Sequence, residues 1–275
     1  MVVNVSPRAR PIPLLDGVMD LDTVGAFPQT SMSDWAAHEE FLSPSGRLVM
    51  PYGGFLIPGS SNRNTLVDVG GGPAFEVPAE SGELVRCGLL PHALERLGVT
   101  PGSIPTIVLT HLHIDHIGWL APDGAPFFPN AEIYCHRADW DYFVDTPDPS
   151  DARIPDWLSG CRDRFILWGG DHTTVGDLVL RHVPGHTPGS IVVTVADQGI
   201  DNALIGDLVH SPVEFLEHWD GLADTDPVQA ASTRHGIKSE FTASGTTVWG
   251  SHFPSMLPGR LVADSADGIT WAQCC

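Results

Sequence analysis

The segment 110–116 reads THLHIDH and follows a short apolar stretch, TIVL, at residues 106–109. His111 and His113 are two residues apart, so their side chains project to the same side of an extended chain. Asp115 and His116 come where the chain begins to turn. Imidazole and carboxylate groups together suit zinc, iron or manganese. The segment therefore predicts one part of a metal site at the end of a buried strand.

Three further segments place a histidine or an aspartate directly after a predicted strand. They are 183-VPGHTPGS-190 with His186, 205-IGD-207 with Asp207, and 251-SHF-253 with His252. Loops at strand ends can converge on one edge of a sheet. Five histidines and two aspartates are too many ligands for one tetrahedral zinc ion, but they suit two metal ions about 3.5–4 Å apart. We therefore expect two divalent ions per chain, zinc first and iron or manganese as alternatives, with a bridging hydroxide as nucleophile.

The order and spacing of HLHIDH, HTPGS, GD and SHF resemble the metallo-β-lactamase superfamily over about residues 45–255. The resemblance implies an α+β fold, a four-layer αβ/βα sandwich with the metals at one edge of its two sheets. It implies that the first metal is held by His111, His113 and His186, that the second is held by Asp115, His116 and His252, and that Asp207 bridges them. Asp68, in 65-TLVDVG-70, would orient a ligand histidine, and a turn-capping acid is the alternative.

The segment 206-GDLVHSPVEF-215 resembles the methyl parathion hydrolase-like and the quorum-quenching lactonase-like branches of that superfamily. Acyl-homoserine lactonases commonly have a tyrosine three residues after the bridging aspartate, where this chain has His210, and Ser190 replaces the last histidine of HTPGH. We name Asp115 and His210 as catalytic candidates. His210 would stabilise the oxyanion or protonate the leaving group; the alternative is a hydrogen-bonded loop residue.

The expected function is hydrolysis of a neutral, partly apolar ester or lactone. Few basic residues lie near the motifs, and an anionic substrate would need arginine or lysine anchors. The alternatives are an organophosphate triester hydrolase, a β-lactamase-like amide hydrolase, an iron redox enzyme of the same fold, and a metal-stabilised binding protein without turnover. Six aromatic residues could line an apolar pocket or belong to the core: Trp119, Phe127, Phe128, Trp157, Phe215 and Trp219.

The charge balance narrows the range of partners. The chain has 14 basic and 34 acidic residues, a formal net charge of −20, which argues against nucleic acid and against an anionic membrane surface. No apolar run is long enough to span a bilayer, and the N-terminus lacks a signal-peptide core. We expect a cytoplasmic protein with a small-molecule substrate, no nucleic acid and no membrane, and we leave a homodimer open.

The chain is expected to form a single domain, residues 1–275, with residues 1–44 as an N-terminal extension packing on it. Two packed sheets flanked by helices are predicted. The predicted strands are 47–51, 54–58, 65–69, 106–109, 131–135, alternating strands within 174–183, and 190–196, 203–205 and 246–250. The predicted helices are 33–41, 85–97, 137–144 and 226–240.

Overall fold

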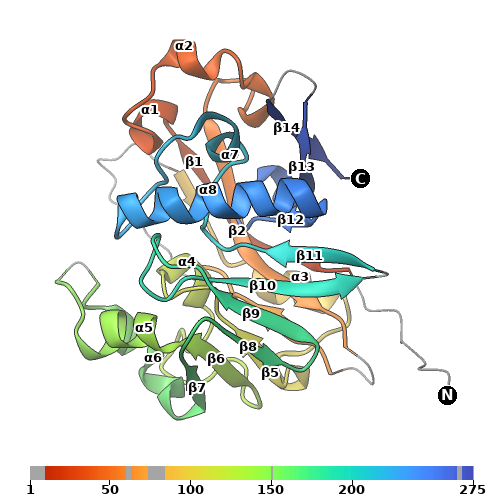
Figure 1. Ribbon diagram of the computed structural model, residues 1–275. Coiled ribbons are helices and arrows are strands. Elements are labelled where there is room, and N and C mark those ends of the chain that lie inside the picture. Colours follow the sequence, from red (N-terminus) through yellow and green to blue (C-terminus); the bar gives the residue numbers. More distant parts are fainter. Residues whose placement is uncertain are drawn as a thin grey trace, which may run out of the picture.

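Two seven-stranded sheets form the centre of the computed structural model, which describes residues 10–59, 63–73, 84–149, 151–197, 199–264 and 268–274 (Figure 1). The first sheet has the order β4 (Leu84–Arg86), β1 (Ile12–Leu21), β2 (Leu48–Ile57), β3 (Thr65–Val67), β5 (Thr106–Val108), β6 (Glu132–His136), β7 (Phe165–Trp168). The second has the order β14 (Ile269–Gln273), β13 (Gly259–Ala263), β12 (Thr247–Trp249), β11 (Ile200–Leu204), β10 (Ile191–Asp197), β9 (Leu178–His182), β8 (His172–Val175).

Helices cover the outer faces of both sheets. α3 (Leu90–Arg96), α4 (Ile114–Ile117), α5 (Arg137–Trp140) and α6 (Ile154–Leu158) contribute to the apolar cluster on the first sheet. The long helix α8 (Pro227–Ser244) packs on the second, where Ile237 and Phe241 join its cluster (Figure 1). α1 (Thr23–Ala26), α2 (Met32–Trp35) and α7 (Val213–Glu217) contribute to a further cluster beside β1 and β2. The predicted α+β sandwich is confirmed.

Shorter helical turns complete the described elements. They are 3-10 turns at Glu39–Phe41, Pro101–Ser103, Ser159–Arg164 and Pro254–Met256, and a π-helical turn at Asp141–Asp145. Within the described ranges, no helix is both long and apolar enough to cross a bilayer.

Apolar side chains from both sheets meet in the core between them. Phe55, Val67 and Val108 of the first sheet pack with Val193 and Trp249 of the second. β3, β5, β6 and β7 run parallel to one another, so the loops that follow them leave at the same edge of the sheet. Asp68 after β3 thus lies beside Thr110 after β5, and its carboxylate accepts hydrogen bonds from the Thr110 amide and hydroxyl, both at 2.8 Å.

The N-terminal part of the first sheet differs from the predictions. β1 was not predicted; it lies between β4 and β2 within the segment expected to be an extension. The strands expected at 47–51 and 54–58 form one continuous strand, β2. Gly53 and Gly54 do not form a turn; they let neighbouring backbone segments approach β2 closely. A Cβ atom at Gly53 would lie 2.0 Å from the Leu14 carbonyl oxygen, and one at Gly54 would lie 2.1 Å from that of Asp68.

Two predicted helices are also corrected. The helix expected at 85–97 begins at Leu90, because residues 84–86 pair with β1 as strand β4. The Leu90 amide donates a 2.8 Å hydrogen bond to Asp16, which fixes the start of α3. The helix expected at 33–41 is instead α2 followed by the separate turn Glu39–Phe41.

Candidate metal centre

The first group of candidate ligands contains three histidines from two loops. His111 and His113 follow β5, and His186 lies in the turn after β9. The Nδ1 atom of His113 is 3.1 Å from Nε2 of His111 and 3.0 Å from Nε2 of His186. Asp207, after β11, places Oδ2 3.6 Å from both of those Nε2 atoms. Three ring nitrogens and one carboxylate oxygen therefore face a common point.

The second group combines α4 with the loop after β12. Asp115 and His116 lie on α4, and His252 follows β12. Nε2 of His116 is 3.2 Å from Oδ1 of Asp207. Nε2 of His252 is 3.2 Å from Oδ2 of Asp207 and 3.3 Å from Oδ2 of Asp115. Asp207 thus turns one carboxylate oxygen to His116 and the other to His252 and the first group.

The seven residues predicted as ligands lie together at one edge of the sheets. Within each group the candidate ligand atoms all lie within 4.8 Å of one another, and Asp207 belongs to both groups. Nε2 of His116 and Oδ1 of Asp207 are buried without an aligned hydrogen bond. Buried polar atoms left in this way are rare unless an ion or water completes them. The geometry and the nitrogen and oxygen donors fit two divalent metal ions that share Asp207.

Four of the histidines are held from behind by a fixed acceptor or hydroxyl group. Nδ1 of His116 lies 2.8 Å from Oδ2 of Asp68, and Nδ1 of His252 lies 2.8 Å from the carbonyl oxygen of Pro51. Nδ1 of His111 lies 3.1 Å from Oγ1 of Thr110, and Nδ1 of His186 lies 3.2 Å from Oδ1 of Asp224. Such contacts fix the ring orientation, so that Nε2 of each ring faces the site. Asp68 makes the predicted contact with a ligand histidine, and it also caps the turn at Thr110.

Sequence reasoning missed two carboxylates that support the site. Asp224 contacts His186 and forms a 2.9 Å ion pair with Arg234. Asp139 is fully buried and accepts hydrogen bonds from the amides of Leu112, at 3.0 Å, and Gly189, at 2.5 Å. It therefore ties the loop of His111 and His113 to the loop of His186. The sequence offered one signal for Asp139. In the predicted helix 137–144 it lies four residues before Phe143, so both side chains would share the apolar face of that helix.

His210, the second catalytic candidate, lies against the candidate metal centre. Its ring is 3 % exposed and stacks on His252 with centroids 5.4 Å apart. Nε2 is 3.4 Å from Oδ2 of Asp207, and Nδ1 is 3.6 Å from Oε1 of Glu214. Glu214 also accepts hydrogen bonds from the amides of His210 and Ser211, at 2.5 and 2.9 Å. One ring nitrogen thus faces the candidate ligands while the other faces a buried carboxylate.

Ser190, which departs from the family motif HTPGH, has a local role in the turn that it ends. Oγ of Ser190 accepts a 3.0 Å hydrogen bond from the Thr187 amide and so closes the turn that carries His186.

Of the six aromatic residues considered for a pocket, Trp119, Phe128 and Phe215 are buried in the apolar clusters. Phe127, Trp157 and Trp219 are half-buried against such clusters.

The two groups differ in their electrostatic environment. Burial lowers the pKa of His111 and His186 below the ordinary value and that of His113 to about 3. Burial also acts to lower the pKa of His252, but the nearby carboxylates of Asp207 and Asp115 raise it to about 9. The same balance raises the pKa of His116. The first group therefore presents neutral imidazoles at neutral pH, whereas the second carries protons in the absence of metal.

The chain is similar in sequence to known proteins. The sequence profile of the metallo-beta-lactamase superfamily matches residues 55–242. An N-acyl homoserine lactonase from Bacillus sp is 28% identical over 173 residues, which are 58% of this chain and 63% of that protein. The N-acyl homoserine lactonase AiiA of Bacillus thuringiensis subsp. kurstaki is 25% identical over 219 residues, 75% of this chain and 83% of that protein. The match with the Bacillus sp protein thus spans less than two thirds of its length.

Solved structures share the fold over nearly the whole chain. AidC, a dizinc quorum-quenching lactonase, has a TM-score of 0.82 and 21% identity, with 97% of each chain covered. The hydrolase AbOPH of the beta lactamase superfamily has a TM-score of 0.80 and 22% identity, with 95% of this chain and 93% of that chain covered. The profile match covers more than half of the chain and contains six of the seven candidate ligands. The chain therefore belongs to the metallo-β-lactamase superfamily.

Proposed function

We propose that this protein is a dinuclear metal hydrolase that opens neutral, partly apolar lactones, with zinc as its native metal. The observation that carries the proposal is the shared carboxylate of Asp207, which belongs to both groups of candidate ligands. A carboxylate shared by two groups, each with three further ligands, is compatible with a two-metal hydrolytic site. Zinc suits the imidazole and carboxylate donors, and it has no redox chemistry that would compete with hydrolysis.

Two divalent ions at these groups would supply a nucleophile derived from water at neutral pH and would polarise the substrate carbonyl. The chain's own residues have separate tasks. Asp115 and Asp207 hold the ions and can accept a hydrogen bond from the attacking water. Nε2 of His210 faces the same region and can donate a hydrogen bond to the developing oxyanion or to the leaving oxygen. Glu214 positions His210 through its backbone amide.

Two lines of support favour a neutral lactone. The relatives reported above are named N-acyl homoserine lactonases, and one of them aligns over 75% of this chain. Arg234 lies behind the candidate metal centre, where it forms a 2.9 Å ion pair with Asp224, the carboxylate that contacts His186. It is therefore not free to anchor an anionic substrate.

The test is a substrate panel on protein of measured metal content. The panel contains γ-lactones with and without an acylamino chain, aryl esters, a phosphotriester and a β-lactam. We expect lactone opening that is lost on chelation and restored by zinc, with Asp207→Asn as the matched inactive control. Turnover of the phosphotriester or the β-lactam without turnover of any lactone would overturn the substrate assignment. Lactone turnover that survives complete removal of metal would overturn the mechanism.

A further inference from the structure

A buried carboxylate in the N-terminal strand lies outside the two groups of candidate ligands. Asp16 is fully buried in β1, where the pairing register with β2 shifts between Leu15 and Gly17. Such a bulge turns a side chain toward a neighbouring segment. Burial raises the pKa of the Asp16 carboxyl, although its hydrogen bonds act in the opposite direction. Because a carboxylate costs free energy to bury, the groups that bind it indicate its role.

Each oxygen of the Asp16 carboxylate accepts two hydrogen bonds. Oδ2 accepts from the amides of Gly71, at 2.9 Å, and Gly72, at 3.1 Å. Oδ1 accepts from the Leu90 amide and from Nε1 of Trp119, both at 2.8 Å. An ionised carboxylate only accepts hydrogen bonds, so it satisfies all four donors. Asp16 therefore joins the turn after β3, the start of α3 and the segment after α4.

The turn after β3 and the segment after α4 are also joined directly. The Val69 amide donates a 2.9 Å hydrogen bond to the carbonyl oxygen of His116, and the Gly118 amide donates a 2.7 Å hydrogen bond to that of Gly70. A Cβ atom at Gly118 would lie 2.0 Å from the carbonyl carbon of Gly71, so a larger residue would force the two segments apart. The position of His116, a candidate ligand of the second group, thus depends on the turn after β3.

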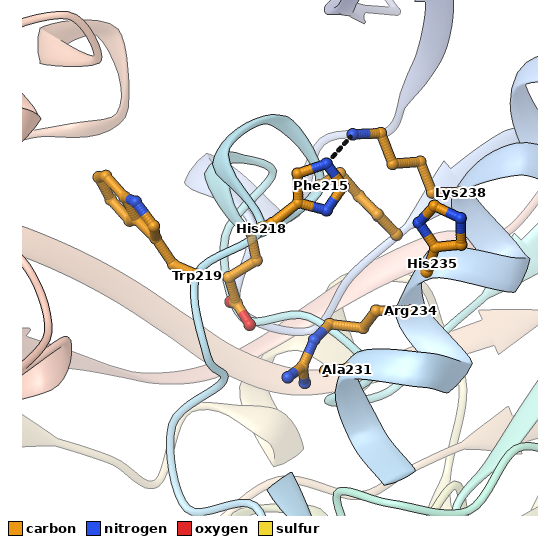
Figure 2. A pocket seen from close by; sticks show the side chains of 8 residues that line it. Phe215, His218, Trp219, Ala231, Arg234, His235 and Lys238 are labelled. Atoms are coloured by element: carbon orange, nitrogen blue, oxygen red, sulfur yellow. Dashed lines mark hydrogen bonds between the residues drawn. The ribbon is translucent and has the colours of Figure 1, made fainter. Parts of the chain in front are cut away.

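The first group has a different support, which comes from α8. Arg234 extends from α8 (Figure 2), and its guanidinium pairs with Asp224 at 2.9 Å. Asp224 contacts Nδ1 of His186 at 3.2 Å, and Nη1 of Arg234 donates a 3.4 Å hydrogen bond to the carbonyl oxygen of Leu208. Among the described residues, the hydrogen-bond partners of the Asp16 and Asp224 carboxylates have no member in common. The two groups are therefore supported separately.

We propose that Asp16 is a positioning residue for the second group. It fixes α4, which carries Asp115 and His116, and it thereby sets the affinity of the centre for the ion held by that group. This inference rests on the proposed two-metal centre and makes the N-terminal strand a working part of it. Asp16→Asn keeps the size of the side chain but turns an NH₂ group, itself a donor, against two of the four donors. The affinity for the second ion should fall, whereas the first ion keeps its own support.

The test measures zinc binding at each group. Calorimetric titration against a competing chelator gives the affinity of each step, and anomalous X-ray scattering from partly loaded crystals shows which group holds the ion. Asp16→Asn should lower the affinity for the second ion by about tenfold or more and change that for the first ion little. Trp119→Phe removes one donor to Asp16 and keeps a buried aromatic ring. It should lower the same affinity by a smaller factor, and it carries the test if Asp16→Asn does not fold.

Asp224→Asn is the matched control, because it removes the charge of a buried carboxylate that supports the other group. It should lower the affinity for the first ion. An unchanged affinity for the second ion in Asp16→Asn and Trp119→Phe would overturn the inference, as would an equal weakening of both ions, which a general loss of stability produces. If the unmodified protein binds fewer than two ions, the two-metal centre itself fails. Two ions bound equally well by the unmodified protein and by Asp16→Asn would overturn this inference alone.

Discussion

At the scale of single residues, Asp207 has the most demanding position, because both oxygens of its carboxylate face candidate ligands of different groups. An amide has no charge and offers one acceptor oxygen instead of two. Asp207→Asn should therefore lower metal content and activity together while the circular dichroism spectrum is unchanged. Elemental analysis and a lactone assay on the same sample check this. Full activity with normal metal loading would remove Asp207 from the site.

His210 is expected to act on the transition state without binding metal. If it stabilises developing charge, His210→Ala should lower kcat and kcat/KM by similar factors, on the order of 10²–10³, or about 2–4 kcal/mol. Metal content should not change, and His210→Gln should recover part of the loss because it keeps a donor. Near-normal kinetics of the alanine variant would identify His210 as a packing residue of its loop.

The residues that could be predicted from the sequence are those whose neighbours along the chain carry the signal. His111, His113, Asp115 and His116 fall within six residues, and the remaining three ligands each follow a recognisable strand. Asp139 and Asp224 give no comparable signal, because their partners are distant in sequence. Asp139 contacts residues 27 and 50 positions away, and Asp224 contacts His186 38 positions away. Such contacts depend on how the loops fold together.

At the scale of elements, the candidate metal centre depends on the loops that follow β5 and β9. Asp139 joins these two loops by accepting hydrogen bonds from the amides of Leu112 and Gly189. Asp139→Ala would leave the buried amides of Leu112 and Gly189 without their acceptor. We expect a loss of about 1–3 kcal/mol for each amide left unsatisfied, seen as a drop in Tm of roughly 2–4 °C per kcal/mol in the metal-free protein. The affinity for the first metal should fall as well, since His113 and His186 lose their common support.

Asp141→Ala is the control for this prediction. Asp141 lies in the π-helical turn that follows α5, and its carboxylate is exposed and 3.8 Å from Arg137. An exposed pair of this kind contributes little, so its Tm should remain close to that of the unmodified protein. A Tm for Asp139→Ala that equals the Tm of this control would show that Asp139 does not hold the loops together.

The elements that sequence reasoning misplaced are those whose limits depend on neighbouring strands. The helical spacing of apolar residues in 85–97 describes α3 correctly from Leu90 onward. It could not show that residues 84–86 pair with β1. The glycines at 53 and 54 indicate a turn when read alone, but they permit the close approach of Leu14 and Asp68 inside one continuous strand. Local patterns predict an element's type better than the contacts that end it.

At the scale of the whole molecule, the two metal groups should respond differently to pH. Carboxylates raise the pKa of His252 to about 9 and also raise that of His116, so both carry protons at neutral pH in the metal-free protein. Burial keeps His111, His113 and His186 neutral. Binding of the second ion should release about two protons and weaken as pH falls from 9 to 6, because protons compete with the metal. The first ion should change little over this range.

Calorimetric titrations in two buffers with different ionisation enthalpies measure the protons released in each step. Metal content after dialysis at pH 6 and at pH 8.5 gives an independent readout, with less of the second ion retained at the lower pH. Equal proton release in both steps, or equal loss of both ions at pH 6, would contradict the assigned charge states.

The central claim is a two-metal centre shared through Asp207, and the most direct measurement is the number of metal ions per chain. Protein loaded with zinc, freed of excess metal and analysed for zinc against protein concentration should contain about two ions per chain. Asp207→Asn should hold clearly fewer under the same conditions. Saturation of the unmodified protein at one ion per chain would contradict the dinuclear account.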